Sequence, residues 1–282
     1  MCYFFYFCYM SNGLYNYYDP EFNPQITKGN QLLIDINDNY FSFVILQTES
    51  KRVLVWGENY AQSELDNPDT LKQILTVKYE DVKVVVPSDS FTIIPKALYN
   101  EHDVDAYRKL LTLGPTDTVL VNGLDASNYV IFKVTEALMK SVGNHVNLNS
   151  IFFAGKVLIA ALNYLKPDAF NLYAHIQGNK LQLVYLKDDL LRFYNSYAFS
   201  NPDELMYYIV LVANELDLNL DETSLILSGE VSISDKKIQR LSDLLPKVYL
   251  NQTQIVALPL GFLPHQVLLL SGLTLCESLV EN

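Results

Sequence analysis

The sequence predicts a mixed α/β protein built from two copies of one unit, in which three strands are followed by a helix, a strand and a second helix. Residues 31–46 (QLLIDINDNYFSFVIL) and 172–186 (LYAHIQGNKLQLVYL) each place two apolar runs around a short polar turn, which is typical of a strand hairpin. A strand-like run and the helix-start signal Asn-Pro-Asp then follow each hairpin. Because these features recur in one order, we interpret the chain as an internal duplication with mixed sheets.

In the first copy, the turn Asn37-Asp38-Asn39 joins the hairpin strands, and its side chains tolerate the positive φ of a tight turn. Asn67 is the expected N-cap of the first helix, with Pro68 at the first helical position. Strands are predicted at 32–36, 41–45, 52–58, 82–86, 91–94, 117–121 and 149–153, and helices from 67 and at 102–111, 130–142 and 156–165.

In the second copy, the hairpin turn is Gln177-Gly178-Asn179, and Asn201-Pro202 supplies the helix start. Strands are predicted at 172–176, 181–186, 190–197, 223–227 and 247–250, and helices at 202–216 and 234–244. The apolar tail after residue 258 is interrupted by proline and glycine, so we expect a buried closing segment and no integral membrane segment.

We therefore divide the chain into three parts. Residues 1–30 form an N-terminal extension that we expect to be partly disordered, residues 31–167 form the first unit, and residues 168–282 form the second unit, with the boundary at Pro167-Asp168. The opening MCYFFYFCYM has no basic residue and lacks the other features of a signal peptide. Two interpretations stay open, a loose tail or a true start at Met10, and we favour the start at Met10.

Composition excludes several classes of function. The formal net charge is −12, with no basic stripe, so a nucleic-acid partner is not expected. Cys2, Cys8 and Cys276 form no disulfide framework, and neither they nor the four histidines have metal-ligand spacing. We therefore predict a cytoplasmic protein with no metal site.

The duplicated layout, together with segments such as DVKVVVPSDSFTIIP at 81–95, resembles the actin-like ATPase fold, a duplicated ribonuclease-H-like architecture. Over nearly its whole length, the chain is also similar to an uncharacterised bacterial family, domain-of-unknown-function family 3822. This resemblance implies two lobes that face each other across a cleft. It also implies that the hairpin of each lobe cradles phosphate in the members that bind nucleotide.

Working members of that fold carry Asp-x-Gly in the first hairpin, where the acid holds Mg²⁺ and the glycine lets backbone N–H groups approach phosphate. In this sequence Asp35 matches the acid, but Asn37 replaces the glycine. In the second hairpin His175 takes the place of the acid and Gln177 that of the glycine, while Gly178 comes one position late.

The adenosine-binding turn of the fold carries two glycines, of which this chain keeps Gly229, followed by Glu230. By resemblance, the candidate nucleotide-binding residues are thus Asp35, Asn37, Gly178 and Gly229. No Gly-x-x-x-x-Gly-Lys-Ser/Thr loop offers another phosphate site. Since the phosphate loops are degraded, we predict no catalytic residues and no cofactor, although Mg-ATP binding stays open.

The sequence therefore predicts a catalytically inactive binding or assembly module with an unidentified protein partner. One alternative is a divergent ATPase or kinase-like protein that uses Asp35 and Gly229. The other is a peripheral component of a pilus- or secretion-like assembly. The sequence does not indicate the oligomeric state.

Other groupings of side chains were weighed against simpler explanations. Asp35, Asp38 and Asp89 would form a carboxylate cluster of the two-metal nuclease type if they met, but turns favour acids in any case. His175, in a strand, is interpreted as a structural histidine rather than a base. The 20 tyrosines include candidates for a protein-binding surface, with core and sheet packing as the preferred alternative.

Overall fold

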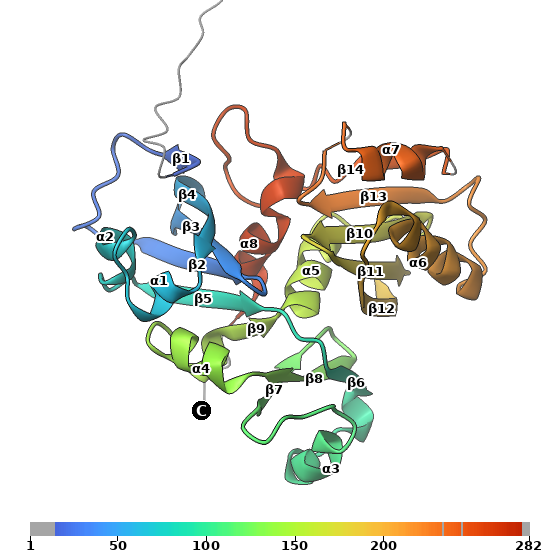
Figure 1. Ribbon diagram of the computed structural model, residues 1–282, viewed down its shortest axis with the longest axis horizontal. Coiled ribbons are helices and arrows are strands. Elements are labelled where there is room, and N and C mark those ends of the chain that lie inside the picture. The colour runs from blue at the N-terminus through green and yellow to red at the C-terminus, as the bar shows by residue number, and fades with distance from the viewer. Residues whose placement is uncertain (1–14, 233, 244, 278–282) are drawn as a thin grey trace, which may run out of the picture.

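The computed structural model describes residues 15–232, 234–243 and 245–277, and it contains three β-sheets with helices between and around them (Figure 1). The start of the predicted extension, residues 1–14, lies outside the described residues. The first sheet has the order β1-β4-β3-β2-β5-β9 and the second the order β12-β11-β10-β13-β14. Apart from the edge strand β1, both orders place the first strand of the unit in the centre, so the predicted duplication is confirmed.

The strands of the first sheet are β1 (Tyr17–Tyr18), β2 (Asn30–Ile36), β3 (Tyr40–Gln47), β4 (Arg52–Ala61), β5 (Asp81–Val86) and β9 (Ile151–Phe153). Those of the second sheet are β10 (Asn171–Gln177), β11 (Lys180–Lys187), β12 (Leu190–Ala198), β13 (Ser224–Gly229) and β14 (Val248–Leu250). In each sheet the hairpin strands pair antiparallel, and the fourth and fifth strands add in parallel.

The α-helices are α1 (Ser63–Asp66), α2 (Lys72–Leu75), α3 (Val104–Arg108), α4 (Glu136–Gly143), α5 (Ala154–Asn163), α6 (Pro202–Glu215), α7 (Lys236–Ser242) and α8 (Leu268–Gly272). Short 3-10 helices lie at Lys96–Leu98, Glu101–Asp103, Leu148–Ser150, Pro264–Val267 and Leu273–Leu275. We call the first sheet with α1, α2, α4 and α5 the first lobe, and the second sheet with α6 and α7 the second lobe. Helices α5 and α8 pack together between the two sheets (Figure 1).

A third sheet, inserted between β5 and β9, forms the lower part of the molecule in Figure 1. Its strands are β6 (Phe91–Pro95), β7 (Thr118–Gly123) and β8 (Asn128–Val134), in the order β6-β8-β7. The helix predicted at 130–142 is therefore wrong in its first part, since residues up to Val134 are strand and helix α4 begins only at Glu136. Val130, Ile131 and Phe132 are all fully buried, so both faces of β8 are apolar and the period of two that marks a strand is lost.

The two Asn-Pro-Asp signals behave differently. Asn201 caps α6 as predicted, since its side chain accepts the N–H groups of Asp203 and Glu204. The helix start predicted at Asn67 is wrong, because Asn67 ends the single-turn helix α1 and α2 begins only at Lys72. The carboxylate of Glu64 accepts the backbone N–H groups of Asp69, Thr70 and Leu71, so an acid from α1 supplies the acceptor that Asn67 was expected to provide.

The hairpin turns also differ. Gly178 has φ +57°, as expected for a tight turn, whereas none of Asn37, Asp38 and Asn39 has a positive φ. The positive φ predicted for the first turn is therefore wrong. There the chain closes through the Asn37 N–H, which donates to the Tyr40 carbonyl at 2.8 Å.

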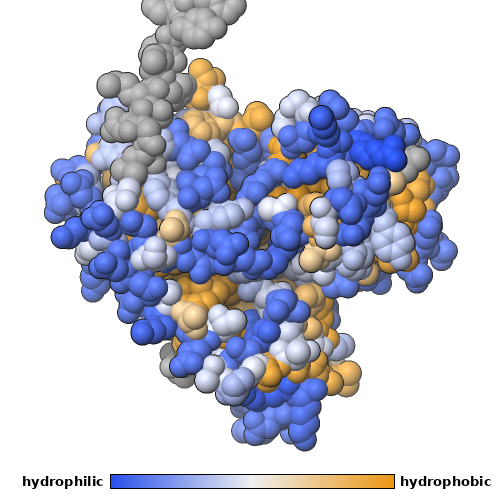
Figure 2. Space-filling view, viewed as in Figure 1, coloured by the Kyte–Doolittle hydropathy of each residue, from blue (hydrophilic) through white to orange (hydrophobic). Residues whose placement is uncertain are grey.

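Two large clusters of buried side chains hold the molecule together. One lies around the second sheet, α6 and α7, and the other joins the first sheet, α5 and residues 255–276. The closing segment, predicted with the second unit, thus shares its core with the first lobe, and the Lys83 ammonium in β5 donates to the Cys276 carbonyl at 2.6 Å. Among the described helices, none has the length and apolar character needed to cross a membrane. Polar side chains cover most of the face in Figure 2, and apolar ones show in smaller patches, some of them in recesses.

Candidate functional site

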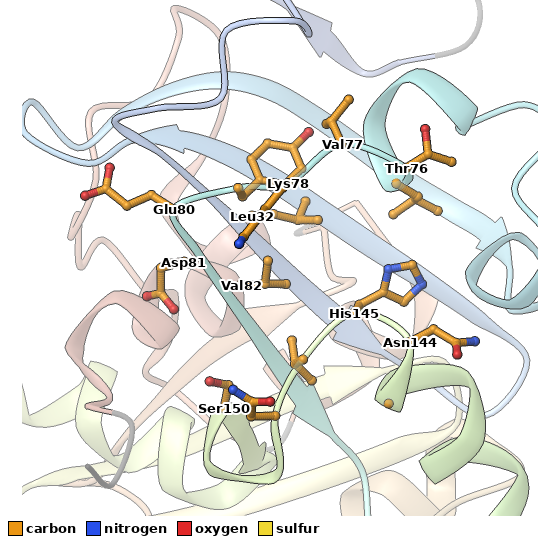
Figure 3. Close-up of a pocket in the computed structure, with 15 residues that line it drawn as sticks. Leu32, Thr76, Val77, Lys78, Glu80, Asp81, Val82, Asn144, His145 and Ser150 are labelled. Carbon is orange, nitrogen blue, oxygen red and sulfur yellow. The ribbon is translucent and has the colours of Figure 1, made fainter.

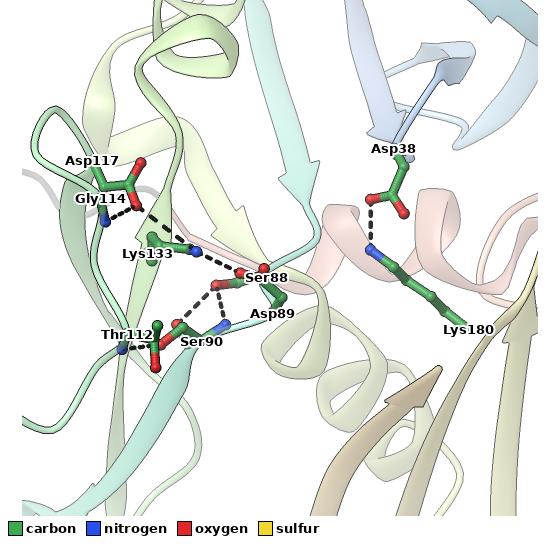
Figure 4. Close-up of polar contacts among 9 residues, drawn as sticks. All are labelled: Asp38, Ser88, Asp89, Ser90, Thr112, Gly114, Asp117, Lys133 and Lys180. Carbon is green, nitrogen blue, oxygen red and sulfur yellow. Dashed lines mark hydrogen bonds and ion pairs between the residues drawn. The ribbon is translucent and has the colours of Figure 1, made fainter. Parts of the chain in front are cut away.

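The two hairpins meet between the lobes, and ion-pair and amide contacts join them. The Lys180 ammonium, at the start of β11, lies 2.5 Å from the Asp38 carboxylate in the first turn (Figure 4). The Gln177 amide, at the end of β10, donates to Asp35 Oδ2 at 3.0 Å. Each contact links residues 142 positions apart in the chain.

Glu230 makes the third connection. Its Oε1 accepts the Tyr40 hydroxyl at 2.9 Å and its Oε2 accepts the Gly178 N–H at 2.9 Å. The Glu230 carboxylate thus accepts hydrogen bonds from Tyr40, in the hairpin of the first lobe, and from Gly178, in the hairpin turn of the second lobe. We call the contacts Gln177–Asp35, Lys180–Asp38 and Tyr40–Glu230–Gly178 the inter-lobe clasp.

Asn37, at the position of the expected glycine, is only 6% exposed and supports the clasp. Its Nδ2 donates to the Tyr40 hydroxyl at 2.9 Å, which holds that hydroxyl toward Glu230. Its carbonyl oxygen accepts from the side chain of Gln62. A side chain therefore fills the space beside the first turn, and that carbonyl is already bonded.

Asp35 is 8% exposed at the end of β2. Burial raises its pKa to about 7, the hydrogen bond from Gln177 opposes this rise, and the negative charge of Glu230 adds to it. Among the described residues, no basic side chain pairs with this carboxyl group. A carboxyl group that keeps its proton near neutral pH is a poor ligand for Mg²⁺, which needs the ionised form.

Gly229 has φ +91°, and a Cβ there would lie 2.1 Å from the Ile176 carbonyl oxygen. The next residue donates its N–H to that same oxygen at 2.7 Å, which turns Glu230 toward the clasp. Contact between two backbones is therefore sufficient reason for glycine at this position.

His175 is 3% exposed within β10, and its Nδ1 lies 3.0 Å from Ser228 Oγ in β13. Burial lowers its pKa to about 4, so the ring is neutral at physiological pH. Its Nε2 has no hydrogen-bond partner within the described part of the chain. A neutral ring therefore stands where the resemblance led us to expect an acid.

Two of the three acids considered as a cluster, Asp38 and Asp89, are each paired with a lysine. Asp89 pairs with Lys133 at 2.9 Å, Lys133 lies 3.8 Å from Asp117, and Asp38 pairs with Lys180 (Figure 4). The Lys133 hydrogen bond lowers the pKa of Asp89. Within residues 15–232, 234–243 and 245–277, no group of three or more potential ligands is placed to hold a metal ion. The carboxylate-cluster hypothesis is therefore wrong.

Cavities lie on both sides of the clasp. One of about 270 Å³ is lined by Asp35, Gln177, Phe153 and Tyr194, and another of about 280 Å³ by Gly229 and Glu230. A separate pocket of about 520 Å³ lies on the first lobe, where Lys78, Glu80 and His145 surround it (Figure 3). None of the candidate residues lines that separate pocket.

The structure thus brings together Asp35, Asn37 and Gly178, while Gly229 positions Glu230. Sequence reasoning missed Tyr40 and Lys180 as parts of the site. No spacing signal marks them, because the Tyr40–Glu230 contact spans 190 positions and Lys180 follows an ordinary strand pattern.

Comparisons place this geometry among known proteins. The model of one family, described as "Protein of unknown function (DUF3822)", matches residues 19–248. No curated protein matches the chain. A crystal structure from Bacteroides thetaiotaomicron, described as a protein with actin-like ATPase fold and unknown function, is similar over 89% of this chain and 97% of that one, with 18% identity and a TM-score of 0.72.

The structure of a PilM–PilN type IV pilus biogenesis complex is similar over 89% of this chain and 98% of that one, with 11% identity and a TM-score of 0.59. The cytoplasmic domain of EpsL from Vibrio cholerae, an inner membrane component of the type II secretion system, has 13% identity and a TM-score of 0.48, and the match covers 90% of this chain and 98% of that one. The similarities to the Bacteroides thetaiotaomicron protein and to the pilus biogenesis complex confirm the actin-like ATPase fold predicted from the duplicated hairpins.

Proposed function

Since this chain belongs to the DUF3822 family, whose description assigns no activity, we propose from the site itself that it is a non-hydrolysing actin-like protein that works as a binding or assembly module. In this proposal the inter-lobe clasp closes the cleft in which other members of the fold hold nucleotide. The proposal includes no cofactor and no catalytic residue.

The observation that carries the proposal is the position of the Glu230 carboxylate. It accepts the Gly178 N–H, the kind of backbone donor that cradles phosphate in a hairpin of this fold, and it also accepts the Tyr40 hydroxyl. A nucleotide phosphate would have to displace a negative group that already has two hydrogen bonds. The Lys180 ammonium, which could attract an incoming polyanion, is already paired with Asp38.

The first hairpin gives further support. Asn37 fills the glycine position, and its bond to Tyr40 makes it part of the clasp. The raised pKa of Asp35 favours the protonated carboxyl group below about pH 7, and a protonated carboxyl group is a poor ligand for Mg²⁺.

A protein partner is the second half of the proposal. The PilM structure was solved in a complex with PilN, and the similarity covers 98% of that chain. We infer that this chain likewise binds a protein, with a peripheral role in a pilus- or secretion-like assembly as the alternative form of the same function. We place it in the cytoplasm, where reducing conditions suit the buried free thiol of Cys276.

Titration of Mg-ATP and Mg-GTP into the full chain tests the closed cleft, with calorimetric heat and melting temperature as the readouts. We expect no heat and no shift, whereas a ligand at 100 times its dissociation constant adds about 2.7 kcal/mol of stability. Glu230→Ala removes the carboxylate that accepts the Gly178 N–H. Glu222→Ala, at an exposed acid away from the clasp, is its matched control. Nucleotide binding that is abolished by Asp35→Ala would overturn the proposal in favour of a divergent ATPase.

A further inference from the structure

Within the described residues, the second sheet ends at β14, and no further strand pairs with its outer edge. Two backbone bonds fix the orientation of β14: the Leu225 N–H donates to the Lys247 carbonyl at 2.8 Å, and the Asn251 N–H donates to the Leu227 carbonyl at 2.7 Å. In a parallel pair, alternate residues bond the same neighbour, so the N–H and C=O groups of Val248 and Leu250 point away from β13. The Leu250 carbonyl accepts instead from the side chain of Gln252 at 3.3 Å.

A row of apolar side chains crosses the sheet toward this edge. Tyr173, Ile226 and Tyr249 are register partners on β10, β13 and β14, so their side chains lie side by side on one face. Tyr173 is 7% exposed, Ile226 is half-buried and Tyr249 is 53% exposed. The row therefore opens at the edge, where a neighbouring strand would continue it.

The groove along this edge has a volume of about 580 Å³ and carries no charged residue. Its lining residues are Leu165, Asn171, Tyr173, Ile226 and 248–253. Leu165, at its margin, is 61% exposed. The other pockets described above each contain at least one acid, in a chain with net charge −12, so an uncharged groove is a distinct local feature.

We propose that β14 receives an extended, uncharged segment of a protein partner as a sixth strand of the second sheet. Backbone groups of that segment bond Val248 and Leu250, and an apolar side chain of the segment packs beside Tyr249. The inference rests on the proposed protein-binding role but is independent of the clasp, which shares no residue with this groove.

A heterologous segment fits this edge better than a second copy of the chain. Strand β14 has only three residues, so two copies paired edge to edge would share only a short ladder, whereas a standard interface buries about 800 Å² on each partner. A flexible segment, by contrast, follows the whole lining from 248 to 253. The absence of charge in the groove favours a segment without charges, since a buried unpaired charge is costly.

The probe is a fluorescein-labelled set of octapeptides in which threonine alternates with valine, isoleucine or tyrosine, added to the full chain. Fluorescence anisotropy gives the dissociation constant, and hydrogen exchange reports on individual amides. We expect at least one peptide to bind and to slow exchange at Val248 and Leu250. N-methylation of alternate residues on one edge of that peptide should abolish binding, while the same change on its other edge should not.

Two tyrosines provide matched variants, because Tyr249 is 53% exposed and Tyr207, on α6, is 59% exposed. Tyr249→Lys should weaken the peptide about fivefold, the change expected when one cross-strand pair is lost, and Tyr207→Lys should leave it unchanged. Both variants should melt as the wild type does, which separates loss of binding from loss of folding.

Failure of all peptides to bind, or binding that Tyr249→Lys leaves unchanged, would overturn the proposal. Self-association of the wild type that Tyr249→Lys abolishes would overturn it in favour of a second copy. Nucleotide binding by the cleft would overturn the closed-cleft proposal but leave the peptide result standing, so the two failures are distinguishable.

Discussion

Replacement of Asp35 by Asn tests the electrostatics of the clasp. The amide keeps an oxygen that accepts the Gln177 N–H, but it cannot ionise. Burial raises the pKa of Asp35 from 3.8 to about 7 in the folded protein, with Glu230 adding to the rise. Between these values the folded state holds a proton that the unfolded state has lost, so the contribution of Asp35 to stability falls as pH rises through this window.

The size of the effect follows from the same pKa values. A difference of about three pH units, at 1.36 kcal/mol each, amounts to about 4 kcal/mol over the whole window and to about 2 to 3 kcal/mol between pH 5 and pH 8. Other groups titrate in both proteins, so the difference between wild type and Asp35→Asn isolates this carboxyl group. The neighbouring residues Glu230 and Tyr40 are present in both proteins.

Urea unfolding of both proteins at several pH values gives the free energies. We expect Asp35→Asn to gain about 2 to 3 kcal/mol in free energy of unfolding on the wild type as pH rises from 5 to 8. Parallel pH profiles would refute the reasoning, because they would mean that Asp35 is ionised and solvated in the folded protein. A solvated, ionised Asp35 would in turn be available to hold Mg²⁺.

Two further predictions compare residues of the same type in different surroundings. Gly229→Ala should cost about 3 kcal/mol or more of stability in thermal unfolding, because its Cβ would meet the Ile176 carbonyl oxygen. Gly261 has φ +92° but open space around it, so Gly261→Ala should cost only about 1 kcal/mol. Equal losses for the two variants would contradict the close approach at Gly229. Asn201→Ala should lose about 1 kcal/mol of stability with its N-cap bonds, and Asn67→Ala less than about 0.5 kcal/mol. A larger loss at Asn67 would mean that it does cap a helix.

Much of the fold follows from local patterns in the sequence. The second hairpin and the helix capped by Asn201 have strong short-range signals, namely alternation, a glycine turn and an N-cap acceptor. The strand β8 was missed because both of its faces are buried, and the start at Asn67 was overridden by the carboxylate of Glu64. Burial of both faces by the rest of the fold decided the first outcome, and an acid five to seven positions from the N–H groups that it accepts decided the second.

The candidate site was less predictable. The degraded positions Asn37 and Gln177 are visible in the sequence, but their contacts depend on how the lobes meet. The sequence marked Glu230 only as the residue that follows the retained Gly229, and its bond to Gly178 requires the left-handed conformation of Gly229 to turn the chain. Such contacts between distant segments have no local signature.

Hydrogen exchange at the Gly178 amide tests the central claim most directly. In the closed cleft this N–H is bonded to Glu230, so we predict slow exchange in the free protein, no change on addition of Mg-ATP and faster exchange in Glu230→Ala. Fast exchange in the free protein that becomes slow with Mg-ATP would contradict the account, because a phosphate would then be the natural acceptor of this N–H.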